Sequence, residues 1–300
     1  MRFLEALEKA PDMVEESIAL CRRAKGEFNN VLVSGMGGSG ITGSIMQEFL
    51  YEKIDKPIIV NKGPFIPGFC GKRTLHVVIS YSGNTRETLD AFARGLAKGC
   101  RTVCITSGGE LSAKAEDLIG VRSGFLPRQA LFCMLVPALG LFYDVPDEVA
   151  RWLRETRDES EKENSDARKL ARRIGERTPL IYGSYPFSSL ALRFKQQVNE
   201  NCKGRAFCNY LPEMNHNEIE SFHNNFRDFA AVSIGSGFER SLDIIRERCD
   251  VMKMELKGNS DIERLFRALY IIDFVTYYMS ELRGIDPAEM PNIDSLKKMA

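Results

Sequence analysis

The sequence predicts an α/β protein of two lobes, each a doubly wound parallel sheet with flanking helices. Two observations lead to this fold class. Short β-branched runs alternate with helical stretches, and the alternation starts again after a charged segment near the middle of the chain. With 300 residues, the chain has a usual length for two domains. We expect the first lobe at 1–150 and the second at 151–300.

The first lobe is expected to begin with amphipathic helix, because residues 1–28 mix acidic side chains among the apolar ones. That mixture is not typical of a signal peptide. The apolar run 130–143 is shorter than the roughly 20 residues that cross a bilayer, and its proline and glycine favour a buried helix. Between these segments the sequence predicts strands at VLVSG, PIIVN, LHVVIS, RTVCIT and IGVRSG.

The charged segment 151–173 contains no glycine or proline, so we expect one solvated helix that joins the lobes. The second lobe repeats the alternation of the first. A long apolar helix is expected at 262–279, and the tail PAEMPNIDSLKKMA ends the chain. Strands are predicted at PLIYGSY, RAFCNYL, FAAVSIGS and VMKMELKG.

The charge balance restricts the partners of this protein. Lys and Arg together number 41, and so do Asp and Glu, so no global field attracts nucleic acid or an anionic membrane. We therefore expect a small-molecule ligand, held by a local site. The 8 cysteines form no C-x-x-C pair and no compact disulfide pattern, which favours reduced thiols and a cytoplasmic location.

The first strand runs into a glycine-rich loop, VLVSGMGGSGITG. Gly35, Gly37 and Gly40 have the spacing of a dinucleotide-binding turn, in which backbone amides approach an anion. That motif also requires an acidic residue about 20 positions later to hold the ribose. The second strand ends instead in Asn61 and Lys62. Because Lys62 could bind a 2′-phosphate, NADP stays open as an alternative. The loop alone predicts an anion rather than a particular cofactor.

The third strand leads into the hydroxyl-rich turn SYSGNTRET. Ser80, Ser82 and Thr85 can all donate to one small dianion, and the amides of 83–85 are expected to point outward at the positive end of the following helix. Neutral donors suit a phosphate monoester that must be released again. An ordinary turn followed by a capped helix is the alternative. The fourth strand end, VCITSGG, adds hydroxyls at the same sheet edge.

The combination of GMGGSG and SYSGNTRET resembles the sugar-isomerase (SIS) domain, and two such lobes in a chain of this length resemble the bifunctional phosphoglucose/phosphomannose isomerases. The resemblance implies that the hydroxyls of Ser80, Ser82 and Thr85 hold the 6-phosphate of a sugar. It also implies that Gly37, Gly38 and Ser39 line the pocket. The expected reaction requires no cofactor and no metal.

Only three histidines are available for acid–base chemistry. His76 lies in an apolar strand and is expected to be structural. The segment PEMNHNE resembles the family motif whose histidine opens the sugar ring from the neighbouring subunit, which implies this role for His216 and a homodimer. The residues alone leave another possibility open, because His216, Glu220 and His223 would share one face of an α-helix and could bind zinc.

Three further residues acquire a role only through the resemblance. From the residues alone, Glu200 is a solvated helix charge, Arg128 forms a salt bridge and Lys297 keeps the tail soluble. Family segments of the form V-x-E-N, L-P-R and I-x-x-L-K match these positions. They imply that Glu200 moves the proton, that Arg128 stabilises the enediolate and that Lys297 assists ring opening.

The resemblance therefore implies an isomerase that converts glucose 6-phosphate and mannose 6-phosphate to fructose 6-phosphate through a cis-enediolate. One departure concerns mannose. The family commonly has threonine before the proline that opens the tail, whereas Met290 precedes Pro291 here. A non-catalytic, sugar-phosphate-binding regulatory SIS protein is the alternative from another class. The absence of a basic stripe disfavours a DNA-binding version of it.

Overall fold

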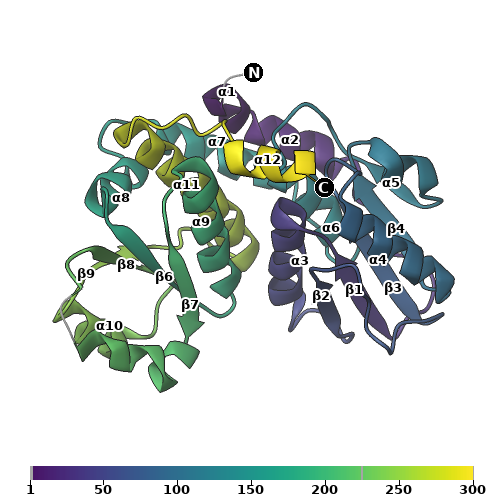
Figure 1. The fold of residues 1–300 in the computed structure, drawn as a ribbon, viewed down its shortest axis with the longest axis horizontal. Helices are drawn as coiled ribbons and strands as arrows, with labels where there is room; N and C mark the ends of the chain where they lie inside the picture. Colours follow the sequence, from purple (N-terminus) through teal and green to yellow (C-terminus); the bar gives the residue numbers. More distant parts are fainter. Residues whose placement is uncertain (1–2, 224–225, 300) are drawn as a thin grey trace. The chain divides into compact units, whose positions relative to one another are not determined.

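The computed structural model describes residues 3–223 and 226–299. The chain divides into two compact units (Figure 1). The N-terminal unit is Lys9–Arg151, and the C-terminal unit begins at Trp152 and also includes the first helix, α1 (Phe3–Glu8). Each unit has its own parallel sheet, so each can be described by itself.

The N-terminal unit contains a five-stranded parallel sheet in the order β2-β1-β3-β4-β5 (Figure 1). The order reverses beside β1, because the chain goes from β1 to one edge and then returns to β3 on the other side. Ligands of open α/β sheets bind where the strand order reverses in this way. The strands are β1 (Asn30–Ser34), β2 (Ile58–Asn61), β3 (Thr74–Ile79), β4 (Arg101–Thr106) and β5 (Leu118–Gly120).

Helices cover both faces of this sheet, which explains why β3 is apolar and buried along its whole length. On one face, α3 packs against α6 and against β1 and β2, while α4 and α5 contact β4 on the other. All residues of α6 are buried, as the sequence predicted for its apolar run. The helices are α2 (Ala10–Ile18), α3 (Gly37–Leu50), α4 (Arg86–Ala97), α5 (Gly109–Lys114) and α6 (Leu131–Gly140).

The C-terminal unit contains a four-stranded parallel sheet in the order β7-β6-β8-β9. The helices α9 and α11 pack together on one side, and α9 contacts β6, β7 and β8. A short 3₁₀ pair, η1 and η2, packs with α10 and the apolar side chains of β6 and β8. The strands are β6 (Thr178–Ser184), β7 (Phe207–Leu211), β8 (Phe229–Ile234) and β9 (Asp250–Met254). The helical elements are α7 (Val149–Ser160), α8 (Asp166–Ile174), α9 (Ser188–Asn201), η1 (Glu213–His216), η2 (Glu218–His223), α10 (Glu239–Arg246), α11 (Asp261–Leu282) and α12 (Pro291–Met299).

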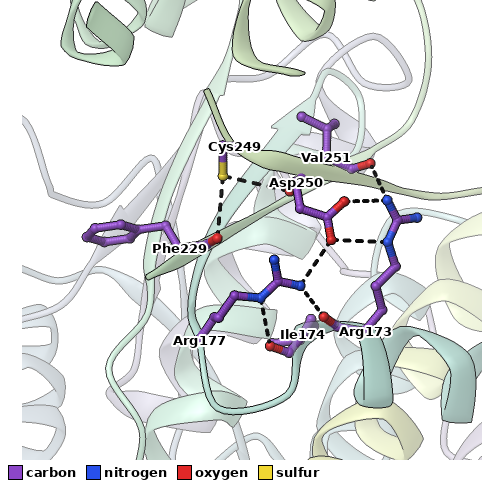
Figure 2. Close-up of polar contacts among 7 residues, drawn as sticks. All are labelled: Arg173, Ile174, Arg177, Phe229, Cys249, Asp250 and Val251. Carbon is purple, nitrogen blue, oxygen red and sulfur yellow. Dashed lines mark hydrogen bonds and ion pairs between the residues drawn. The ribbon is translucent and has the colours of Figure 1, made fainter. Parts of the chain in front are cut away.

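Asp250 joins the edge strand β9 to the end of α8. Figure 2 shows its carboxylate held by two arginines: Arg173 donates to both oxygens, with its Nε 3.2 Å from Oδ2, and Arg177 donates to Oδ2 at 3.0 Å. Arg173 also donates to the carbonyl of Val251 at 3.3 Å. These hydrogen bonds lower the pKa of the Asp250 carboxyl, first of all through Arg173. The edge strand is thereby fixed to a helix at its first residue.

The expectation of one continuous helix at 151–173 is wrong. α7 ends at Ser160, and α8 begins only after Ser165, whose hydroxyl accepts a hydrogen bond from the amide of Arg168 at 3.3 Å. Serine is a favoured N-cap because its side chain satisfies an amide of the first helical turn. The serine therefore starts a new helix although the segment contains no glycine or proline.

The fold class is confirmed, since both sheets are parallel and every strand expected from the sequence is present. The long apolar helix expected at 262–279 is α11. Among the described residues, none of the helices combines the length and the apolar character that a membrane span requires.

Candidate active site

The glycine loop connects β1 directly to α3, and its tight geometry depends on glycine. A Cβ on Gly40 would lie 2.8 Å from the carbonyl oxygen of Gly35, closer than folded proteins tolerate. Gly37 has a φ of +51°, which L side chains rarely adopt. The G-x-G-x-x-G spacing therefore reflects a tight strand-to-helix turn at the carboxyl edge of the sheet.

Gly38 and Ser39 connect this loop to other parts of the unit. A Cβ on Gly38 would lie 2.9 Å from the carbonyl oxygen of Pro127, so the loop touches the segment that carries Arg128. The Ser39 hydroxyl accepts a hydrogen bond from the backbone amide of Tyr81 at 3.2 Å. Arg128 itself is 3% exposed and has electrostatic or hydrogen-bonding partners. The structure thus brings Gly38 close to the backbone of Arg128.

Two of the predicted phosphate-binding hydroxyls lie side by side at the end of β3. The Ser80 hydroxyl, 1% exposed, donates to Thr85 Oγ1 at 3.2 Å. Thr85 occupies the N-cap position of α4, but its side chain makes no capping hydrogen bond. Ser82 is exposed at the tip of the same turn. The first amides of α4 therefore donate no hydrogen bond to the Thr85 hydroxyl.

The expectation that the amides of 83–85 all point outward is wrong for two of them. The amide of Gly83 donates to the carbonyl of Ser80 at 3.0 Å, and the amide of Asn84 donates to the Ser82 hydroxyl at 3.3 Å. These bonds close the turn on itself. Those two amides therefore bond within the turn and are not offered to a ligand.

The loop after β4 supports this turn. The Asn84 side chain accepts the amide of Glu110 at 2.9 Å, and the amide of Leu111 donates to the carbonyl of Gly83 at 2.9 Å. A Cβ on Gly83 would overlap the carbonyl of Gly108. The Ser107 hydroxyl donates to the carbonyl of Tyr81 at 2.6 Å. The additional hydroxyls expected at this edge thus bond within the protein.

The end of β2 carries no carboxylate for a ribose. Asn61 donates to the Ser34 hydroxyl at 3.2 Å and to the carbonyl of Gly63 at 2.9 Å. The Lys62 side chain lies beside the glycine loop, with Cε 3.6 Å from the position of a Cβ on Gly40. Partial burial lowers the pKa of Lys62. This edge resembles a site for a compact anion more than the ribose end of a dinucleotide site.

His76 has the structural place that its apolar strand predicted. It is fully buried, and its Nε2 lies 2.8 Å from the Ser34 hydroxyl. Burial lowers the pKa of His76 to about 4, because the charged imidazolium is disfavoured inside the sheet. The ring is therefore neutral at pH 7.

Glu200 lies in the last turn of α9 and is half-buried. The apolar side chains Leu190, Phe194 and Val198 of the same helix are fully buried, as their spacing predicted. Lys203 fixes the helix end by donating to the carbonyl of Glu200 at 2.8 Å and to that of Asp286 at 3.0 Å. The backbone that carries Glu200 is therefore well anchored.

His216 ends η1 and is exposed. The zinc alternative required a continuous α-helix, but the backbone breaks at Asn217 (φ −154°, ψ −71°) and continues as a second 3₁₀ helix. His216, Glu220 and His223 therefore do not share an α-helical face. Within residues 3–223 and 226–299, no group of three or more His, Cys, Asp or Glu is arranged to hold a metal ion.

The structure does not bring Glu200 and His216 together within one copy of the chain. Glu200 precedes β7 and lies at the end of the crossover helix α9, whereas His216 follows the carboxyl end of β7. A strand of this length spans about 15 Å at roughly 3.3 Å per residue, which separates the two ends of the sheet. Lys297 lies in α12, and its side chain is outside the described part of the chain.

Sequence reasoning gave Glu218 no role, yet this carboxylate joins η2 to the sheet. It accepts hydrogen bonds from the Tyr182 hydroxyl at 2.7 Å and from the Asn209 amide at 2.6 Å. The pairing of β6 with β7 brings these donors together, and no local sequence pattern reports that pairing. A carboxylate two residues after His216 was the only available signal.

Both units have the parallel α/β fold of the SIS class. Residues 163–299 match the family described as bacterial phospho-glucose isomerase C-terminal SIS domain. The structure is similar to that of glucosamine-6-phosphate deaminase from Thermotoga maritima, with a TM-score of 0.75, 15% identity and coverage of 96% of this chain and 97% of the other.

Two relatives define the family more narrowly. The bifunctional phosphoglucose/phosphomannose isomerase of Thermoplasma acidophilum is 35% identical over 99% of this chain and 97% of its own. That of Thermoplasma volcanium is 36% identical over 99% of both chains. The chain belongs to the bifunctional phosphoglucose/phosphomannose isomerase family.

Proposed function

We propose that this protein is an aldose–ketose isomerase that interconverts glucose 6-phosphate and mannose 6-phosphate with fructose 6-phosphate. The observation that carries the proposal is the convergence of the glycine loop, the Ser80–Thr85 turn and the buried Arg128 at one edge of the N-terminal sheet. The family to which the chain belongs supports the choice of reaction.

The N-terminal unit supplies the groups that bind the substrate. The hydroxyls of Ser80, Ser82 and Thr85 hold the 6-phosphate at the start of α4, where the helix dipole favours an anion. Gly37, Gly38 and Ser39 form the wall against which the sugar lies. Arg128 keeps its charge at any pH relevant to the enzyme and stabilises the negative enediolate oxygen.

The C-terminal unit supplies the acid–base groups. Glu200 removes the proton from C2 of the open-chain aldose and returns it to C1, which converts aldose to ketose through a cis-enediolate. His216 and Lys297 move the protons that open and close the ring. These steps need neither a redox cofactor nor a metal ion.

We also propose that the enzyme is a cytoplasmic homodimer in which His216 acts in the active site of the partner. The separation of Glu200 and His216 at opposite ends of β7 supports this arrangement. A single copy would then lack the ring-opening group in its own site.

A coupled assay with both aldose phosphates tests the proposal. We expect turnover of both substrates and exchange of the C1 or C2 proton with solvent. The Glu200→Gln variant should lose at least about 10³-fold in kcat, because it removes the proton carrier. Glu247→Gln, at the end of another helix, is the matched control and should keep wild-type kcat. A folded Glu200→Gln enzyme with near-wild-type turnover would contradict the role of Glu200 as proton carrier. Binding of fructose 6-phosphate without proton exchange would instead support a regulatory protein.

Met290 provides a test of substrate preference. It precedes α12, and its carbonyl accepts the amide of Asp294 at 2.9 Å. We expect Met290→Thr to raise kcat/KM for mannose 6-phosphate relative to glucose 6-phosphate, because a hydroxyl replaces an apolar side chain. An unchanged ratio would show that this position does not select the epimer.

A further inference from the structure

Glu218 is held by two strands at once. Its Oε1 accepts the Tyr182 hydroxyl of β6 at 2.7 Å, and its Oε2 accepts the Asn209 side-chain amide of β7 at 2.6 Å. Tyr182 and Asn209 are direct partners in the β6–β7 pairing, so their side chains leave the sheet beside each other. One carboxylate thus receives one donor on each oxygen, and the spacing of the two strands sets its orientation.

Tyr182, the donor from β6, is buried. Tyr182 is 1% exposed and packs in the same apolar cluster as Met214 and Phe222, which belong to η1 and η2. Burial, and then the hydrogen bond to Glu218, raise the pKa of the Tyr182 phenol. The hydroxyl therefore stays protonated and acts as the donor. A buried hydroxyl that loses its acceptor is costly, so this bond resists opening.

Asn217 stabilises the turn between η1 and η2. Its side chain accepts the amide of Glu218 at 2.6 Å and donates to the Glu213 carboxylate at 3.1 Å. His216 thus lies on a short exposed arc between two buried anchors, Met214 and Phe222. The arc is fixed to the sheet through the carboxylate of Glu218.

We propose that Glu218, clamped by Tyr182 and Asn209, is a positioning residue that holds the His216 backbone in the place from which the imidazole acts. The inference rests on the proposed ring-opening role of His216. Glu218 does not touch the sugar in this proposal; it acts through the segment that carries the histidine. Misplacement of a catalytic group by about 1 Å can cost roughly 100-fold in rate.

The expected effects follow from which atoms each variant removes. Glu218→Ala removes both acceptors and should lower kcat by about 10- to 100-fold, with KM changed less than about threefold. Tyr182→Phe removes one hydroxyl and should lower kcat by less. Glu218→Gln keeps one carbonyl acceptor and should recover part of the activity lost in Glu218→Ala. The matched controls are Glu220→Gln, exposed in the same 3₁₀ helix, and Tyr210→Phe, exposed on β7; both should keep wild-type kcat.

A double-mutant cycle with His216→Ala separates positioning from general destabilisation. If Glu218 acts through His216, Glu218→Ala should cost nothing further in the His216→Ala background, because coupled residues are not additive. Melting temperatures and circular dichroism of the full-length variants verify folding. If Glu218→Ala does not fold, Tyr182→Phe completes the same cycle.

The possible failures can be told apart. If His216→Ala keeps wild-type kcat, the ring-opening role fails, and the positioning role fails with it. Two results would overturn only the positioning role, provided that His216→Ala is impaired. The first is wild-type kcat in Glu218→Ala and Tyr182→Phe. The second is a loss of kcat in these variants that adds fully to the loss in His216→Ala.

Discussion

Gly38 shows how the lack of a side chain allows two loops to approach each other closely. The glycine allows the loop after β1 to lie against the carbonyl of Pro127, one residue before Arg128. Gly35 and Gly40 allow the turn itself to close. The sequence motif thus encodes close contacts within the protein.

We expect Gly38→Ala to lower kcat/KM by about tenfold or more. The added Cβ must push away the Pro127–Arg128 segment, and a displaced arginine stabilises the enediolate poorly. Gly63→Ala, where a Cβ meets nothing within 4 Å, is the control and should have normal kinetics. Steady-state assays with glucose 6-phosphate measure the effect. Equal values for the two variants would show that the close approach does not matter.

His76 predicts a pH dependence of stability. Its pKa is about 4 in the folded protein and about 6.5 in an unfolded chain, so the unfolded state binds more protons between these values. The free energy of unfolding should therefore fall as the pH drops from about 6.5 to 4, by up to about 3 kcal/mol from this group.

Urea unfolding across this pH range tests the effect of His76. His76→Gln should reduce the pH dependence, whereas His223→Gln, at an exposed position, should keep it. Identical slopes for all three proteins would contradict the assignment.

At the scale of elements, α9 and α11 meet through a buried polar row. Arg193, Gln197 and Asn201 recur every four residues along α9 and face Asp273 and Thr276 of α11. Arg193 pairs with Asp273 at 2.9 Å, with both side chains almost completely buried. Buried polar partners favour one register of two helices over others. The helix that carries Glu200 is held in this way.

We expect Asp273→Ala to destabilise the C-terminal unit by about 3–5 kcal/mol, because it leaves the buried guanidinium without its anion. Asp273→Leu combined with Arg193→Met should recover much of this loss. Asp261→Ala, which breaks an exposed pair with Arg264 in the same helix, is the control and should cost about 1 kcal/mol or less. Shifts of the urea midpoint measure the differences. A small effect of Asp273→Ala would indicate that the pair contributes little.

The elements differ in how far the sequence predicts them. The strands were predictable because a parallel strand buried on both faces must be a short apolar run, as in Thr74–Ile79. The break between α7 and α8 was missed because Ser165 was not recognised as an N-cap within a charged segment. The contacts of Glu218 could not be predicted, because they depend on the register of two strands that are distant in sequence.

At the scale of the whole molecule, the residues proposed to bind the substrate and those proposed for acid–base chemistry belong to different units. Residues Lys9–Arg151 contain the glycine loop, the Ser80–Thr85 turn and Arg128, while Glu200 and His216 belong to the C-terminal unit. Within that unit the two acid–base residues lie at opposite ends of β7. This separation is the reason for the proposed sharing of His216 between two copies of the chain.

Mixing two inactive variants tests this sharing. Random pairing of Glu200→Gln with His216→Ala subunits gives one half mixed dimers, and each mixed dimer has one intact site. After unfolding and refolding together, the mixture should regain about a quarter of wild-type activity. Each variant refolded alone is the control. No gain over the controls would place Glu200 and His216 in the same copy.

The distance between the two ends of β7 also affects how activity depends on the amount of protein. If each site takes its histidine from another copy, a separated subunit cannot open the sugar ring. Activity per milligram should then fall on dilution below the dissociation constant of the dimer, and substrate that bridges the subunits should oppose this fall. The length of one short strand would thereby link turnover to protein concentration.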